Sequence, residues 1–283
     1  MAMSPSAVVD RFVEIDGLRL NTRRRPGPEG PTLLLLHGIG GSLEAWGTVL
    51  EAFPHRDVLM VDAPGAGRSD VPKYPLRVGG VADVIVAAAR ELGVDQADVL
   101  GFSLGGAFAQ EVVHRHPDFV RRLVLVATMS GAWFRMPKPS AVRALASTSR
   151  YRSREAAEKQ IPMLAGGRSA RDPEVLAAIL DEREGTPPTE RGYRFQQLSV
   201  MGWTSLPWLR RIKAPTLVLL GEEDPIIHVS TGSVLARRIP GARREIVPGA
   251  GHMLLFDEPE RSLPIVAGFL TADGPKRPMS QGA

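Results

Sequence analysis

One short turn restricts this chain more than any other stretch of its sequence. Residues 101–106 read Gly-Phe-Ser-Leu-Gly-Gly, and they lie between the apolar run 97–100 and the helix-like run 107–113. A Gly-x-Ser-x-Gly sequence between a strand and a helix is typical of a nucleophile elbow, in which Ser103 takes a strained conformation and its hydroxyl stands above the sheet edge. Glycine on either side leaves room for that turn. The pattern also fits a glycine-rich loop with Ser103 as an ordinary helix N-cap, so the rest of the chain has to decide.

The absence of cysteine limits the chemistry that the chain can perform. None of the 283 residues is a cysteine, which excludes a disulfide, a thiolate metal site and a cysteine nucleophile. Hydrophobic residues make up 43%, as in ordinary globular proteins, and no apolar run approaches the roughly 20 residues of a membrane helix. The first residues lack the charged and apolar regions of a secretory signal. We expect a cytoplasmic protein that needs no metal or other cofactor.

The net charge of +4 comes from basic residues that are spread along the chain. Arginine pairs and triplets lie far apart, at 23–25, 121–122, 210–211, 237–238 and 243–244, and they do not interleave with aromatic residues as a nucleic-acid surface would. We therefore expect solvated surface charges and no nucleic-acid partner. An anionic partner is the alternative interpretation.

Apolar runs of strand length alternate with helical patterns along most of the chain. Residues 12–22 read as a hairpin around Asp16-Gly17, which is a strong turn signal. Runs typical of buried parallel strands follow at 31–36, 57–62, 97–100, 122–127, 215–220 and 244–248. Helical patterns lie between or after them, at 42–52 (with Ser42 as the expected cap), 78–92, 107–113, 230–238 and 258–270. This order predicts an α/β fold with a mostly parallel, doubly wound sheet.

The pattern of buried strands stops between residues 129 and 212. This segment has amphipathic helical stretches, prolines and scattered large apolar residues, and the strand pattern resumes at Pro215. We interpret 129–212 as a helical cap inserted into a core made of residues 1–128 and 213–283. A separate domain and a disordered linker are the alternatives, although the segment is too apolar for a linker.

Ser103 needs a general base, because an isolated hydroxyl is a poor nucleophile near neutral pH. Among six histidines, His252 follows the last predicted strand on a glycine-lined loop, at the sheet edge where the elbow lies. Asp224 follows the preceding strand at the same edge, and we predict that it orients the imidazole. Glu222 and Glu223 compete for that role but are expected to be exposed. The chain order of Ser103, Asp224 and His252 is that of the α/β-hydrolase triad.

Acyl transfer also needs hydrogen-bond donors for an oxyanion. The predicted donors are the backbone N–H groups of Leu104, at the helix start, and of Ile39, in the glycine-rich loop that begins at His37. The His-Gly loop, the elbow, the Asp turn and the Gly-x-Gly-His loop thus occur in a consistent order. Over residues 12–270 the chain resembles the α/β-hydrolase fold with a helical cap, and the resemblance implies a serine hydrolase.

A narrower resemblance comes from the inserted segment and the strand and helix after it. Residues 166–168, 171–174, 202–209, 215–219, 224–227 and 235–240 are similar to bacterial intracellular poly(3-hydroxyalkanoate) depolymerases. This resemblance implies that Ser103 attacks a polyester ester bond, forms an acyl-enzyme and releases hydroxyacids or oligomers with water. The chain departs from that family at Leu104, where the family tends to have Trp, and at His37, where it tends to have Asn. Hydrolysis of small esters, lactones or thioesters is the alternative.

The remaining predictions concern what binds. We expect an ester with an apolar acyl part to contact His37, Met129, Trp133, Phe134, Trp203 and Met253. The aromatic members can instead pack the cap on the core, and an exposed subset would suit the surface of a polymer granule. A cofactor-free haloperoxidase or acyltransferase on the same triad, and a ligand receptor without enzymatic activity, are further alternatives. The sequence indicates no oligomeric state.

Overall fold

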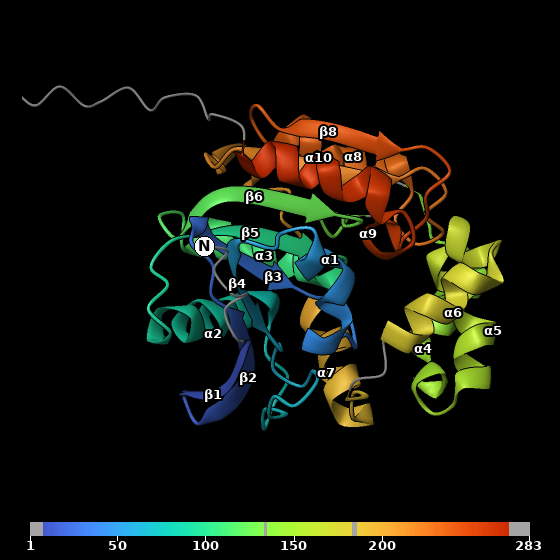
Figure 1. The fold of residues 1–283 in the computed structure, drawn as a ribbon, viewed down its shortest axis with the longest axis horizontal. Coiled ribbons are helices and arrows are strands. Elements are labelled where there is room, and N and C mark those ends of the chain that lie inside the picture. Colours follow the sequence, from blue (N-terminus) through green and yellow to red (C-terminus); the bar gives the residue numbers. More distant parts are fainter. Residues whose placement is uncertain (1–7, 133–134, 183–185, 272–283) are drawn as a thin grey trace, which may run out of the picture.

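The computed structural model describes residues 8–132, 135–182 and 186–271, and a twisted sheet lies at its centre (Figure 1). The strands found in these ranges are β1 (Val9–Ile15), β2 (Leu18–Arg25), β3 (Glu29–Leu36), β4 (Arg56–Val61), β5 (Ala97–Phe102), β6 (Val120–Val126), β7 (Thr216–Gly221) and β8 (Arg243–Val247). They lie in the order β1-β2-β4-β3-β5-β6-β7-β8. Strands β1, β2 and β4 pair antiparallel, and all later pairs are parallel. The predicted mostly parallel α/β sheet is confirmed.

The antiparallel edge begins with the predicted hairpin. Asp16 and Gly17 both take positive φ, at 50° and 74°, which is the conformation of a two-residue turn whose twist matches its strands. Residues Val9 to Ile15 then pair in register with Arg24 to Leu18. The hairpin extends the sheet away from the parallel strands, whose carboxyl ends meet at another edge.

Helices cover both faces of the sheet and bury two apolar layers. On one face, the side chains of Ile85, Phe108 and Leu235 join the first layer; on the other, Val49, Leu254 and Val266 join the second. The helices of the first face are α2 (Val78–Glu91), α3 (Leu104–Arg115) and α8 (Val229–Arg238), and those of the second are α1 (Gly47–Glu51), α9 (Leu254–Asp257) and α10 (Pro259–Thr271). Within the described ranges, none of the helices has the length and apolar character needed to span a membrane.

The start of one predicted helix differs from the prediction, and one short helix was not predicted. Ser42 makes no side-chain cap, and the predicted helix begins instead as a 3₁₀ turn over Leu43–Trp46 before α1. The reason is that the Leu43 N–H donates to the Asp62 carboxylate, which takes the place of a local cap. The sequence pattern also missed α9, a single turn between the His252 loop and α10.

The segment between β6 and β7 is helical, and its described residues contain no strand. Its helices are α4 (Pro139–Ala146), α5 (Arg154–Ala165), α6 (Pro173–Glu182) and α7 (Glu190–Val200). In Figure 1, α4, α5 and α6 stand together beside one end of the core, and α7 lies closer to α1. Ile161 of α5 and Ile179 of α6 join the same apolar layer as α9 and α10, so the segment packs directly on the core. Its action as a cap stays a prediction.

Candidate active site

Ser103 occupies a strained turn between β5 and α3. Its φ and ψ are 54° and −118°, a region that costs a residue other than glycine about 1–3 kcal/mol. The turn depends on the glycines around it: a Cβ on Gly101 would lie 2.4 Å from the Gly105 carbonyl oxygen, and one on Gly105 would lie 2.0 Å from the Leu36 carbonyl oxygen. The start of α3 therefore approaches the end of β3 more closely than any side chain would permit.

The structure brings Ser103, Asp224 and His252 together at the carboxyl ends of the parallel strands. The Ser103 Oγ lies 3.0 Å from His252 Nε2, and His252 Nδ1 lies 2.7 Å from Asp224 Oδ2. The other oxygen of Asp224 accepts the N–H groups of Ile226 and Ile227, each at 2.8 Å, which fixes the carboxylate. Because an ionised carboxylate only accepts, Nδ1 carries the proton and Nε2 is left to accept from the serine hydroxyl.

The His252 loop is held by the inserted segment. The His252 N–H donates to the carbonyl of Ala165, the last residue of α5, at 2.6 Å. Three glycines permit this contact: a Cβ on Gly251 would lie 2.0 Å from the Ala165 oxygen, one on Gly167 would lie 2.2 Å from the Gly251 nitrogen, and one on Gly166 would lie 2.7 Å from the Glu223 oxygen. Backbone therefore packs against backbone on the side of the loop away from Ser103.

The two predicted oxyanion donors lie at the wall of one cavity with Ser103. Leu104 begins α3, and Ile39 lies in the turn that the Gly41 N–H closes onto the Gly38 carbonyl at 3.1 Å. Within the described part of the chain, neither the Ile39 N–H nor the Leu104 N–H donates to a protein group. That they donate to an oxyanion stays a prediction.

The cavity beside Ser103 is apolar and has a volume of about 220 Å³. Of the predicted pocket residues, Met129 and Trp203 line it. The indole N–H of Trp203 donates to Glu111 at 2.7 Å, so its polar edge is paired and its ring is left for the cavity. The other lining residues are Ile39, Leu104, Ala107, Thr128, Leu145, Gln197, Val200, Ile226 and Ile227.

Two predicted substrate contacts are placed elsewhere. The His37 ring packs in a T-shaped arrangement on Trp46 and Phe102, at centroid distances of 5.0 and 5.7 Å, and does not line the cavity beside Ser103. Met253 is the N-cap residue just before α9 and is buried in the apolar layer that α9 covers. Neither side chain lines this cavity, since proximity in sequence to Ile39 or His252 does not fix the face toward which a side chain turns, and their contact with a substrate stays a prediction. Trp133 and Phe134 lie outside the described residues.

The competing acids are exposed, as expected. Glu222 accepts from the Gly249 N–H at 2.9 Å, and Glu223 pairs with Arg171. In the described residues, no three or more His, Cys, Asp or Glu side chains gather in a way that could hold a metal ion.

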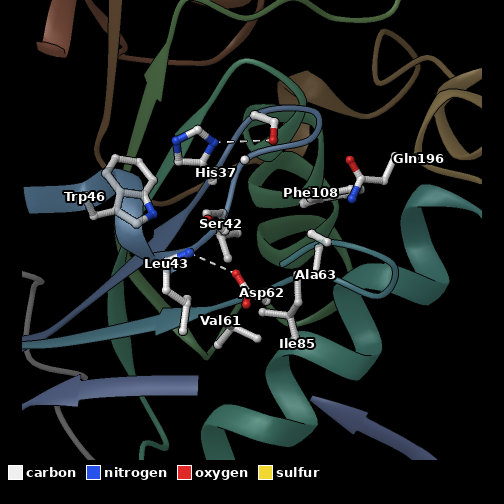
Figure 2. Close-up of a pocket in the computed structure, with 14 residues that line it drawn as sticks. His37, Ser42, Leu43, Trp46, Val61, Asp62, Ala63, Ile85, Phe108 and Gln196 are labelled. Atoms are coloured by element: carbon white, nitrogen blue, oxygen red, sulfur yellow. Dashed lines mark hydrogen bonds between the residues drawn. The ribbon is translucent and has the colours of Figure 1, made fainter. Parts of the chain in front are cut away.

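Asp62 is a buried carboxylate that the sequence pattern did not single out. It follows β4 and accepts three hydrogen bonds, from the Leu43 N–H at 2.9 Å, the Arg68 N–H at 3.1 Å and the Asn21 amide at 2.7 Å. Figure 2 shows the hydrogen bond from Leu43 to this carboxylate at the wall of a small cavity that His37 also lines. Burial raises the pKa of Asp62 from its ordinary value of 3.8 to about 6, against the opposing effect of the hydrogen bonds. Asp62 thus ties the loop after β3, which carries Ile39, to β2 and the loop after β4.

This fold and site define a class of protein. The family model for the alpha/beta hydrolase fold matches residues 31–259, so the chain belongs to the α/β-hydrolase fold family. With its relatives, this membership identifies it as a hydrolase.

Particular relatives narrow the comparison. The chain is 37% identical over 268 residues to a poly(3-hydroxyalkanoate) depolymerase of Ectopseudomonas oleovorans, covering 94% of each chain. Among solved structures, it is similar to Est816, an N-acyl homoserine lactone degrading enzyme, with a TM-score of 0.77 and 28% identity over 92% of this chain and 100% of that one. It is also similar to the enol-lactonase of Burkholderia xenovorans LB400, with a TM-score of 0.76 and 25% identity over 93% and 100%.

Gly105→Ala tests the close approach of α3 to β3. The added methyl group would meet the backbone oxygen of Leu36 at 2.0 Å. We therefore expect α3 to shift and the free energy of unfolding to fall by several kcal/mol. Gly268→Ala in α10 is the matched control, since a Cβ there meets nothing within 4 Å. That variant should gain about 0.5–1 kcal/mol from helix propensity. Equal unfolding free energies for the two variants in urea would contradict the prediction.

Asp62→Asn tests the buried carboxylate through pH. Because the folded-state pKa of Asp62 is about 6 and its ordinary value is 3.8, protonation favours the folded state, and this contribution is lost as pH rises through about 6. The stability of the original protein relative to Asp62→Asn should therefore fall by about 1.5 kcal/mol between roughly pH 5 and pH 7.5. Urea unfolding across this range measures the difference. A difference that does not change with pH would show that Asp62 does not titrate there.

Proposed function

We propose that this hydrolase cleaves carboxylic esters through an acyl-enzyme on Ser103. The observation that carries the proposal is the continuous hydrogen-bonded series Asp224–His252–Ser103, which ends at an apolar cavity. In the first step, Ser103 Oγ attacks the ester carbonyl carbon while His252 Nε2 takes the hydroxyl proton. Asp224 stabilises the imidazolium that forms.

The tetrahedral intermediate places a negative charge on the former carbonyl oxygen. The backbone N–H groups of Ile39 and Leu104 are the proposed donors to it, and each such donor typically lowers the barrier by about 3 kcal/mol. The intermediate collapses when His252 returns its proton to the alcohol oxygen and the ester C–O bond breaks. A water molecule then attacks the acyl-enzyme by the same route, which releases the acid and restores Ser103.

A polyester is the substrate that we propose first. The support is the 37% identity to the depolymerase over nearly the whole chain, together with a cavity whose walls are mainly apolar. In this proposal the segment 129–212 acts as a cap that supplies much of the acyl site, and the enzyme works in the cytoplasm on esters at a granule surface.

Lactone hydrolysis is the second candidate, because two structural neighbours with at least 25% identity are a lactone-degrading enzyme and an enol-lactonase. A panel of soluble esters, lactones and amorphous polymer granules separates the two candidates. Turnover of lactones with no acid released from granules would favour the second. Adding an alcohol to the ester assay separates hydrolysis from acyl transfer.

Ser103→Ala tests the nucleophile. We expect turnover of p-nitrophenyl octanoate to fall by at least 10³-fold, because removal of a triad member leaves only the contribution of binding and the oxyanion donors. A phosphonate ester should label the original protein with one equivalent and should not label the variant. Circular dichroism and thermal unfolding serve as the folding controls. Substantial turnover by folded Ser103→Ala would disprove the acyl-enzyme on Ser103.

Val200→Phe tests the cavity as the acyl site. Val200 lies on α7 and lines the cavity, whereas Leu198 on the same helix is 41% exposed and does not. The larger ring should take the space of one or two methylene groups of the acyl chain, whose binding is worth about 1–3 kcal/mol. We therefore expect kcat/KM for an octanoyl ester to fall by about tenfold relative to kcat/KM for an acetyl ester. Leu198→Phe is the matched control and should leave the ratio unchanged. The same ratio in all three proteins would mean that the acyl chain binds elsewhere.

A further inference from the structure

We propose that Gln196 is a positioning residue for the loop after β3, which carries the proposed oxyanion donor Ile39. Through Gln196, the inserted segment holds the Ile39–Gly40 peptide in its working orientation. The proposal rests on the function proposed above, because it concerns the donor at Ile39. It assigns a role to a residue of α7 that neither the family model nor the triad requires.

Two residues of the inserted segment form hydrogen bonds with the N–H and the C=O of one peptide unit. The Gly40 N–H donates to Gln196 Oε1 at 2.8 Å, and the Tyr151 hydroxyl donates to the Ile39 carbonyl at 3.3 Å. The N–H of Gly40 and the C=O of Ile39 belong to the same planar peptide, so the two contacts together fix its rotation. This peptide turns about the axis that joins the Cα atoms of Ile39 and Gly40, and at Ile39 it adjoins the preceding peptide, whose N–H is the proposed oxyanion donor.

The side chains of Gln196 and Tyr151 are themselves restrained by their surroundings. Gln196 is 4% exposed, and Figure 2 shows its side chain directed toward the core beside Phe108. Arg150, which is buried, donates to the Tyr151 hydroxyl at 3.2 Å. Because the arginine has no acceptor, the Tyr151 oxygen must accept from it and send its own proton to Ile39.

Close packing keeps α7 at this distance from the core. Gly192, near the start of α7, lies so near the loop after β4 that a Cβ on it would be 2.2 Å from the Gly65 oxygen. Gly40 has a φ of +67°, and a Cβ on it would lie 2.3 Å from the Tyr151 hydroxyl. The loop therefore has the backbone freedom to turn at Gly40, and the contacts from α7 and Tyr151 select one orientation.

Gln196→Met removes the acceptor and keeps the length of the side chain. We expect kcat for a soluble octanoyl ester to fall about 10- to 100-fold with KM changed less than about twofold, because misplacement by about 1 Å costs up to about a hundredfold. Phosphonate labelling of Ser103 should slow by a similar factor. Gln196→Glu retains an oxygen at the same position and should recover most of kcat, which a merely structural loss would not do.

Gln160→Met is the matched control, since Gln160 lies on α5 and bonds only to Ser149 within the inserted segment among the contacts described. It should leave kcat unchanged. Tyr151→Phe removes the hydrogen bond to the Ile39 carbonyl and should lower kcat several-fold. This second variant keeps the test decisive if Gln196→Met folds poorly. Unchanged kcat in folded Gln196→Met, or in Tyr151→Phe when the former does not fold, would overturn the proposal. Failure of the proposed function looks different, because turnover would then survive Ser103→Ala.

Discussion

The contact between the start of α3 and the end of β3 is the constraint on which the site depends. With no side chain at Gly105, the helix begins against the Leu36 carbonyl, and this places Leu104 beside the loop that carries Ile39. The same turn forces Ser103 to positive φ and points its hydroxyl toward His252. A helix that started only a little further from the sheet would separate the nucleophile from one of its two proposed oxyanion donors.

The inserted segment supports this arrangement from the opposite side. The last carbonyl of its α5 accepts from the His252 N–H, and Gln196 of its α7 accepts from the Gly40 N–H, so two loops of the core donate hydrogen bonds to residues far away in sequence. At the His252 contact, glycines allow backbone to meet backbone. A segment bound in this way acts as part of the frame of the site, and any movement that lifted it as a whole would also release both loops.

The sequence predicts the sheet and the three central side chains because each depends on local pattern and chain order. Buried parallel strands are continuous apolar runs, and residues just after them meet at one edge. Asp62, Tyr151 and Gln196 could not be found in this way, since each is a single polar residue whose partners lie far away in the chain. Packing against Trp46 and in the α9 layer keeps His37 and Met253 out of the cavity beside Ser103, so their contact with a substrate stays a prediction.

The proposed triad and much of the cavity wall come from different parts of the chain. Ser103, Asp224 and His252 all follow strands of the core, whereas several cavity walls belong to the segment between β6 and β7, namely Met129, Leu145, Gln197, Val200 and Trp203. Substitutions in that segment can reshape the cavity while the distances of 3.0 and 2.7 Å among the three core side chains stay fixed. Relatives named for polyester and lactone substrates are consistent with such a division. Gln196 limits that freedom, because it belongs to the inserted segment and yet accepts the Gly40 N–H in the core loop that carries one of the proposed oxyanion donors.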